Sequence, residues 1–474
     1  MVDLNASDKV TSSPRPWFMS VGMLGASDLL ARSAGWLGFV YLMHLVDPGV
    51  YGLLGMASSV VSILLPFVDL GLGVIATREA ALPSANAEGL LRIVTLRRGI
   101  LAIGVFLVVV ISSRFVSPPL LGRLLLGSSL FVFVGALTPD WLLQARERFG
   151  SIAFGRIIQS GVYLAMLLFL VRAPADIVIQ PVVAAFSFGV GICAVLPATA
   201  SILRTSHGRE DAPVRVSSRS SWDAFVGTIA LQNVLPLSIL GVGVFSNSSE
   251  AGWLNAASRF WIVGTSVAIL PATVYFPRLV AARNNGVDVV NVFRQAMIST
   301  GLVSGLLVMS GILWSVPLLE LLAPEDFRES AISLAILCVG LGFQTTTVSF
   351  ARMLIAFNEE RKLRRGLLTG ALLGASSIPV LSGIYGSWGG ALSCTIAEGI
   401  ALTGTWIVLA SRFPQAHGTV LNGFSRGFSP VAVLAVVIVT ARQAIGVHWH
   451  IEMITTLCAV SGIVVYHRFW SEMQ

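Results

Sequence analysis

Apolar segments of about twenty residues recur along the whole chain, and short polar connections rich in arginine separate them. An α-helix needs a segment of this length to cross the roughly 30 Å hydrocarbon core of a bilayer. Only 12% of the 474 residues are charged, whereas soluble domains carry roughly 25%. The pattern predicts an all-α, polytopic membrane protein. It excludes a soluble enzyme, a disordered chain and an outer-membrane barrel, whose strands alternate polar and apolar residues.

The hydropathy pattern divides the chain into about fourteen expected transmembrane helices. They cover residues 17–45, 50–76, 99–113, 119–143, 150–171, 178–203, 222–244, 252–280, 295–315, 331–357, 366–385, 388–411, 428–446 and 450–467. Because the third span is short and the thirteenth is weakly apolar, twelve is the alternative count. No connection between spans has room for a catalytic or nucleotide-binding domain.

The basic residues predict an orientation, because cytoplasmic loops of membrane proteins carry an excess of lysine and arginine. With the N-terminus inside, the inside connections hold 22 of the 31 basic residues, Arg98 among them, and the outside connections hold 5. We therefore expect both termini in the cytoplasm. This topology accounts for the net charge of +7, so we expect no nucleic-acid partner.

The longest connection, 204–221, is polar and lies near the middle of the chain. We interpret it as a cytoplasmic linker between an N-terminal six-helix bundle over 1–203 and a C-terminal six-helix bundle over 222–411. Residues 412–474 then add two C-terminal helices and a tail.

A weak internal repeat supports the division into two bundles. One segment begins at Asp47 and a similar one begins at Ser248, about 200 residues later. Each has a small polar turn, a glycine beside an aromatic residue (Tyr51 or Trp253) and then an apolar helix. Because six spans is an even number, both bundles enter the membrane in the same direction. We expect an axis along the membrane normal to relate them, with a central cavity between them.

The cysteines give no sign of a metal site or a redox site. All four lie inside apolar segments, and none has a Cys-x-x-Cys neighbour. They are typical of small core residues. The sequence predicts no cofactor.

Five stretches of the chain resemble an oligosaccharide flippase of the polysaccharide transporter family. They begin with LVDPGVYGLLGMASSVVSILLPFVDLGLGVIATREAA and cover residues 45–81, 141–158, 250–282, 316–337 and 386–400. The superfamily also holds multidrug extruders and lipid II flippases. The resemblance implies two helical bundles that move a lipid-linked oligosaccharide from the cytoplasmic to the periplasmic leaflet of the cell inner membrane. Membrane lipids are expected partners, and a polysaccharide polymerase is a candidate partner.

Arginines within the spans are the candidate contacts for the diphosphate of such a substrate. Insertion of an ionisable side chain costs roughly 2.5–3.5 kcal/mol, so it usually faces a cavity or a partner. Guanidinium grips phosphate with two parallel hydrogen bonds. The candidates are Arg32, Arg259 and Arg352. Alternatively, Arg32 pairs with Asp28, one helical turn earlier, and the other two arginines extend to an interface.

Carboxylates within the spans are candidates for ion coupling. Glu398 lies near the middle of its span, and Asp69 and Asp28 lie in the second and first spans. Their alternative roles are structural. Asp140 follows a proline, so the alternative there is a cap on a broken helix. Two tryptophans deep in their spans, Trp36 and Trp261, are candidates to stack on a sugar ring.

Two other functions stay open at this point. A multidrug or cation antiporter of the same fold needs an acidic cavity. The ionisable residues within the expected spans are instead four acidic ones (Asp28, Asp69, Asp140 and Glu398) and four basic ones (Arg32, Arg156, Arg259 and Arg352). A membrane-embedded enzyme of glycan assembly needs a substantial outside loop, and the longest one lies near 316–330. We therefore expect a flippase rather than an enzyme.

Overall fold

The computed structural model describes most of the chain. The described residues are 35–82, 86–206, 222, 225, 229, 233–285, 289–357, 359–414 and 416–445. Asp28, Arg32, most of the expected linker and the expected last span lie outside these ranges. Within them the chain forms helices and no β-strand, as the hydropathy pattern predicts.

The first half begins with a short apolar helix, Gly35–Leu45. It continues with α2 (Pro48–Asp69), α3 (Leu72–Ala80), α4 (Ala87–Ser113), α5 (Pro119–Ala136), α6 (Asp140–Ala145), α7 (Phe149–Leu170), the 3-10 turn η1 (Pro174–Ile179) and α8 (Gln180–Ser206).

The second half contains α10 (Val234–Phe245), α11 (Ser248–Ala268), α12 (Leu270–Asn285), α13 (Val289–Leu322), the 3-10 turn η2 (Glu325–Phe327), α14 (Ser330–Ala356), α15 (Glu360–Arg412) and α16 (Ala416–Ile445). In the described ranges, nine helical segments are long and apolar enough to cross a membrane, and two shorter helices are apolar. The chain is an integral membrane protein, and the total of fourteen spans stays a prediction.

Several expected spans are interrupted by local breaks. The span expected over 50–76 breaks where Leu70 and Gly71 adopt left-handed backbone conformations, with φ of 44° and 71°. The span expected over 119–143 is divided between α5 and α6. Two spans expected over 366–385 and 388–411 form the two parts of α15, which bends at Gly386 with φ 58°. Glycine adopts this conformation without the steric cost that a Cβ brings.

Two helices, α2 and α11, begin with the same kind of cap. The Asp47 carboxylate accepts hydrogen bonds from the backbone N–H groups of Gly49 and Val50 at 2.8 and 3.1 Å. The Asn247 side chain accepts one from the N–H of Glu250 at 2.9 Å. Asp and Asn are favoured at this position because they satisfy N–H groups that lack a partner in the first turn. The capped helices are the two segments of the internal repeat.

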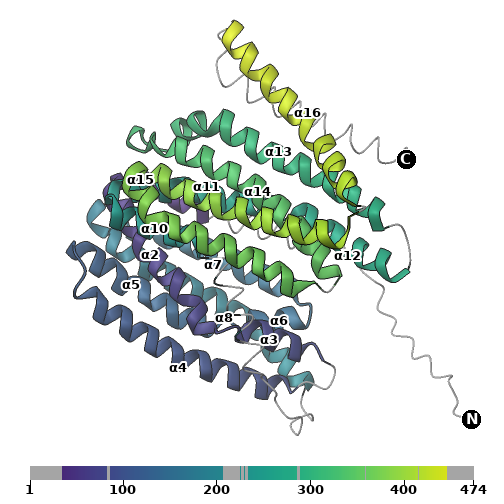
Figure 1. The fold of residues 1–474 in the computed structure, drawn as a ribbon. Helices are drawn as coiled ribbons and strands as arrows, with labels where there is room; N and C mark the ends of the chain where they lie inside the picture. The colour runs from purple at the N-terminus through teal and green to yellow at the C-terminus, as the bar shows by residue number, and fades with distance from the viewer. Residues whose placement is uncertain are drawn as a thin grey trace, which may run out of the picture.

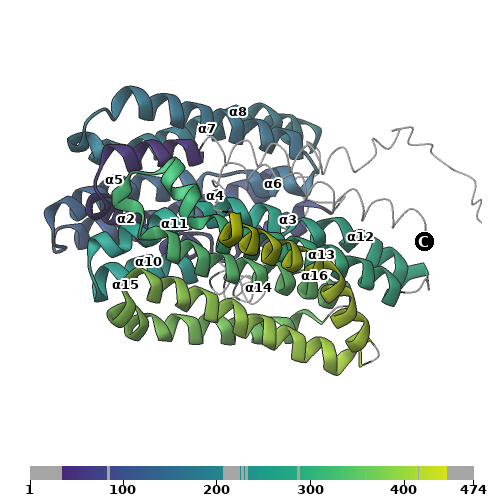
Figure 2. The same ribbon diagram turned by 90° about the horizontal axis from the view of Figure 1, so that it is seen from above.

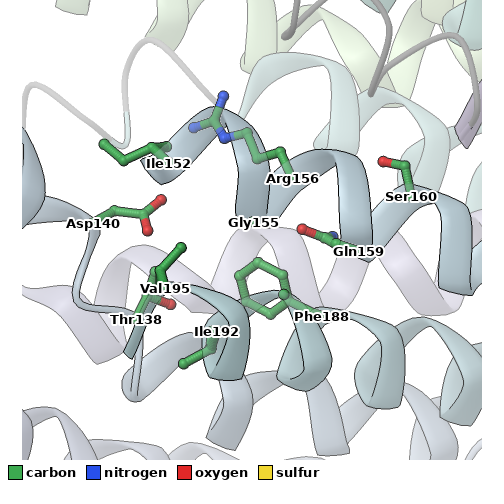
Figure 3. A pocket seen from close by; sticks show the side chains of 11 residues that line it. Thr138, Asp140, Ile152, Gly155, Arg156, Gln159, Ser160, Phe188, Ile192 and Val195 are labelled. Carbon is green, nitrogen blue, oxygen red and sulfur yellow. The ribbon is translucent and has the colours of Figure 1, made fainter. Parts of the chain in front are cut away.

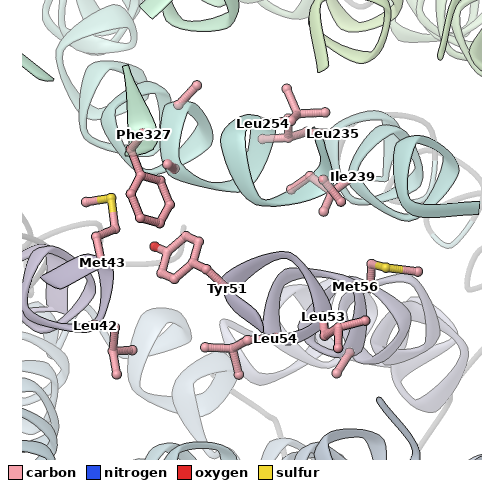
Figure 4. Close-up of a cluster of buried hydrophobic side chains, with 14 of the residues drawn as sticks. Leu42, Met43, Tyr51, Leu53, Leu54, Met56, Leu235, Ile239, Leu254 and Phe327 are labelled. Carbon is pink, nitrogen blue, oxygen red and sulfur yellow. The ribbon is translucent and has the colours of Figure 1, made fainter. Parts of the chain in front are cut away.

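The helices of the two halves form adjoining groups that meet at α2, α10 and α11 (Figure 1). One buried cluster crosses the boundary, and Figure 4 shows Tyr51 of α2 directed at Phe327 of η2. Their rings meet edge to face, with centroids 5.5 Å apart. Separate clusters lie within each half, around Leu142 in the first and Phe293 in the second. The domain boundaries expected from the sequence remain a proposal.

The helix α16 packs along α13 (Figure 2). Backbones approach closely there, because a Cβ at Gly301 or Gly427 would overlap a backbone carbonyl of the opposite helix. Small residues at helix interfaces permit this packing in membranes. The structure therefore attaches the expected thirteenth span to the second half.

Candidate functional site

Arg259 of α11 lies at the boundary between the two halves. Its guanidinium carbon is 3.7 Å from the centre of the Phe39 ring, in helix Gly35–Leu45. Its Nη2 donates a hydrogen bond to Asn255 Oδ1 at 2.9 Å. Its buried Nε has no hydrogen-bond partner in the described part of the chain. No carboxylate of those residues forms an ion pair with Arg259. The cation thus keeps capacity to bind an anion.

Polar groups of both halves surround this arginine. Asn255 Nδ2 donates to the backbone carbonyl of Tyr51 at 3.3 Å, which links Arg259 to α2 through one side chain. The hydroxyls of Tyr51 and Tyr163 both lie within electrostatic reach of the guanidinium. Gln180 donates to the Tyr163 hydroxyl at 2.9 Å. We call Arg259 with these partners the arginine cluster.

The two halves are in contact where α2 and α11 begin. Gly52 and Gly252 bring the two backbones together. The connection between α13 and α14 covers this contact, because Trp253 Nε1 donates to the Asp326 carbonyl at 2.8 Å. The Glu250 carboxylate accepts from the Ser387 N–H at 2.8 Å. We call these N-terminal turns of α2 and α11, with their covering contacts, the closed end.

A polar pocket of about 410 Å³ lies between the end of α5, the start of α6, α7 and α8 (Figure 3). Its polar side chains are Thr138, Asp140, Arg156, Gln159 and Ser160, and the Phe188 ring forms part of its wall. The Asp140 carboxylate interacts electrostatically with Arg156 and with Arg98. Gln159 and Ser160 precede Tyr163 by one turn of α7, on the same face. The polar pocket is therefore adjacent to the arginine cluster along α7.

The other expected substrate contacts occupy different places. Arg352 is exposed, with its guanidinium 5.3 Å from the centre of the Phe276 ring of α12. Trp36 meets Phe260 edge to face at 5.6 Å. Trp261 is half-buried and packs against the cluster shared by both halves. Of the described candidates, the structure brings Arg259 and Trp36 near each other and leaves Arg352 apart.

Asp69 and Glu398, two of the described candidates for ion coupling, have protein partners. Asp69 forms an ion pair with Arg98, and its carboxylate accepts a hydrogen bond from the Gly73 N–H in the first turn of α3. Glu398 accepts a hydrogen bond from Gln344 Nε2 at 3.3 Å. Their role in coupling remains a proposal.

Several residues of these sites are not among the candidates that the sequence predicts. The sequence predicts Arg98 in a connection, yet it is 8% exposed within α4 and also donates to the Thr138 carbonyl at 3.2 Å. The sequence does not distinguish Arg98 from Arg92 and Arg97, which lie close to it and are exposed. Asn255, Gln180 and Gln344 are uncharged, so the cost of a charge within a span does not single them out. Their position in apolar helices was the available signal.

The fold is that of a polytopic membrane protein with two packed helical halves. The structure is similar to the lipid II flippase MurJ in an inward closed conformation, with a TM-score of 0.72 at 15% identity, covering 95% of this chain and 99% of that one. It is also similar to an inward-facing multidrug resistance transporter of the MATE family, in the MOP superfamily, with a TM-score of 0.60 at 11% identity, covering 81% and 95%. A MOP superfamily transporter from Pyrococcus furiosus matches with a TM-score of 0.56 at 13% identity, covering 84% and 96%.

The family follows from the sequence itself. Residues 19–283, more than half of the chain, match the family model described as polysaccharide biosynthesis protein. The chain belongs to this family, which confirms the resemblance identified from the five stretches. No curated protein sequence matches the chain.

Proposed function

We propose that this protein moves a polyprenyl-diphosphate-linked oligosaccharide, the repeat unit of a surface polysaccharide, from the cytoplasmic to the periplasmic leaflet. The observation that carries this proposal is Arg259, a cation at the boundary of the two halves with no ion-pair partner among the described residues. The family and the MurJ-like fold support it.

Arg259 is suited to a diphosphate because guanidinium is permanently charged and presents several N–H donors in one plane. Asn255 accepts from one donor, and Phe39 stacks on the guanidinium face. These two contacts fix the orientation of the guanidinium, and its remaining N–H donors are the proposed contacts for the diphosphate. Hydrogen bonds to charged groups contribute about 1.5–3 kcal/mol each.

The polar pocket is the proposed site for the sugars. Carboxylate, carboxamide and hydroxyl groups offer donors and acceptors to sugar hydroxyls, and Phe188 offers an apolar face. A diphosphate at Arg259 places the next groups along α7, toward Gln159 and Ser160. The substrate is thus proposed to extend from the arginine cluster into the first half.

Alternating access is proposed to work through the closed end. The hydrogen bonds from Arg259 to Asn255 and from Asn255 to Tyr51 connect the anion site to the contact between α2 and α11. A diphosphate competes with Asn255 for the guanidinium, which weakens this link. Under the proposed topology, with both termini in the cytoplasm of an inner-membrane protein, the closed end faces the periplasm. Opening there releases the headgroup on that side.

The proposed activity is transport without catalysis. Membrane lipids surround the protein, and a polymerase is a candidate partner.

The alternative, a multidrug or cation antiporter of the same fold, has the MATE-like structures in its favour. The positive charge of Arg259 at the boundary disfavours the antiporter, because it repels an organic cation.

Binding measurements separate the two functions. Protein in nanodiscs is expected to bind undecaprenyl diphosphate, and Arg259→Ala is expected to weaken binding by about 10- to 100-fold. Arg123→Ala, at an exposed position of α5, is the matched control and should leave binding unchanged. Efflux of a cationic dye by liposomes containing the protein, with no binding of the diphosphate, would support the antiporter instead.

A further inference from the structure

A second pocket, of about 450 Å³, lies between helix Gly35–Leu45 and the helices α11, α13 and α14. Small-molecule sites have volumes of roughly 300–1,000 Å³. Three half-buried aromatic residues line it: Trp36, Phe260 and Trp314. Buried residues of α14 complete the lining: Leu334, Cys338 and Leu341. We call it the aromatic pocket.

The aromatic pocket has no charged group among its lining residues. The Ser310 hydroxyl on its rim already donates to the Leu307 carbonyl of its own helix at 3.1 Å. The rings of Trp36 and Phe260 meet edge to face at 79°, and both line the pocket. Contact with such a surface favours an apolar chain and disfavours a polar ligand, whose groups would lose their hydrogen bonds.

The aromatic pocket and the arginine cluster share two helices. Phe260 directly follows Arg259 in α11, and Trp36 precedes Phe39 by one turn on the same face of helix Gly35–Leu45. Phe39 is the ring that stacks on the Arg259 guanidinium. A strong cation therefore adjoins an apolar pocket, which is the pattern that an amphiphile with an anionic head and an apolar chain requires.

We propose that the aromatic pocket holds the first isoprene units of the lipid carrier while Arg259 holds its diphosphate. This proposal rests on the proposed function and assigns a second part of the same substrate. The chain of a polyprenyl diphosphate begins at the phosphate oxygen. A phospholipid instead places a glycerol and ester carbonyls between phosphate and chain, and the pocket offers those carbonyls no charged partner.

Filling the pocket tests the proposal. Ser310 is exposed on the rim, so Ser310→Phe occupies pocket space without a buried clash. The variant is expected to weaken binding of geranylgeranyl diphosphate by about tenfold or more in nanodiscs and to leave binding of inorganic diphosphate unchanged. The matched control is Ile312→Phe, on the same helix but outside the pocket lining, with 54% exposure. It should change neither.

The outcomes distinguish this proposal from the proposed function. If Arg259→Ala weakens binding of both diphosphates and Ser310→Phe changes neither, the aromatic pocket is wrongly assigned and the flippase proposal stands. If Arg259→Ala changes neither, the diphosphate site itself is wrong. Equal weakening of both ligands by Ser310→Phe indicates a general disturbance and also overturns the assignment.

Photochemical labelling gives an independent test that needs no substitution. Geranylgeranyl diphosphate with a diazirine on its chain is expected to label peptides that contain Phe260 or Trp314, and the unmodified compound should compete. A phosphatidylcholine with a diazirine on an acyl chain serves as the comparison. If it labels the same peptides and geranylgeranyl diphosphate does not compete, membrane lipid occupies the pocket and the proposal is overturned.

Discussion

Gly52 of α2 and Gly252 of α11 pack against each other across the boundary of the two halves, in a reciprocal contact. A Cβ built on Gly52 would overlap the carbonyl oxygen of Ser248, and one built on Gly252 would overlap that of Pro48. Gly252 lies 200 positions after Gly52, and Ser248 lies 200 positions after Pro48. The contact therefore has the two-fold symmetry of the internal repeat.

This symmetry predicts that the closed end is sensitive to one added methyl group. Gly52→Ala or Gly252→Ala forces the backbones of α2 and α11 apart, so the closed end should open more often. Spin labels at Phe115 and Leu321, both exposed near this end, should then report longer distances. Gly104→Ala is the control, because a Cβ at this position would meet no atom of another residue within 4 Å, its own helix aside. Identical distance distributions in all variants would show that this contact does not control closure.

The internal repeat was visible in the sequence, but the contact between its two helices, α2 and α11, was not. Asp47 and the polar residues near Ser248 predicted the starts of two related helices. The offset was approximate, because the structural counterpart of Asp47 is Asn247, where the second cap lies. Sequence similarity between two helices does not say whether they touch. Hydropathy likewise placed most helices, because each must match the thickness of the bilayer.

Charge pairing is the part of the site that the sequence left open. Asp69 and Arg98 are 29 positions apart, and nothing local links them. Their pairing depends on the packing of α2 beside α4, which is a tertiary property. Arg259 was identified because a charge in an apolar span is expensive. That no described carboxylate pairs with it became visible only with the neighbouring helices in place.

The ion pair of Asp69 predicts a structural role for this residue. Removal of one partner of a fully buried pair costs about 3–5 kcal/mol. The Asp69 side chain is 32% exposed, so solvent screening reduces the effect. We expect Asp69→Asn to lower the free energy of unfolding by about 1–3 kcal/mol, measured by thermal or denaturant unfolding in detergent. Glu320→Gln, which breaks a surface pair with Arg328, should cost less than about 0.5 kcal/mol. A stable Asp69→Asn protein that has lost ion-dependent transport would assign Asp69 to coupling instead.

Glu398 provides a test of proton coupling. Glu398→Gln retains a hydrogen-bonding side chain opposite Gln344 and removes the group that accepts a proton. If Glu398 couples transport to protons, the variant should transport at the same rate with and without an imposed pH gradient. The assay is transport into liposomes at both conditions. Glu88→Gln, at an exposed position of α4, should keep the wild-type response. A full response in Glu398→Gln would remove this residue from coupling.

A substitution in the polar pocket is expected to weaken binding of the glycan without weakening binding of the diphosphate. Gln159→Leu removes a donor and an acceptor from the pocket. It should weaken binding of a glycan-bearing polyprenyl diphosphate by about 5- to 30-fold and leave binding of undecaprenyl diphosphate unchanged. Gln144→Leu, at an exposed position of α6, controls for the change of side chain. Equal effects on both ligands would place Gln159 outside a sugar site.

The most direct measurement of the central proposal is the rate at which a labelled polyprenyl-diphosphate-linked oligosaccharide crosses the bilayer of proteoliposomes. Wild-type protein and Arg123→Gln should move the label to the opposite leaflet at equal rates. Arg259→Gln should reduce the rate by about 10- to 100-fold while the protein remains folded. A wild-type rate in Arg259→Gln, or no movement by the wild-type protein, would contradict a flippase that holds its substrate at this arginine.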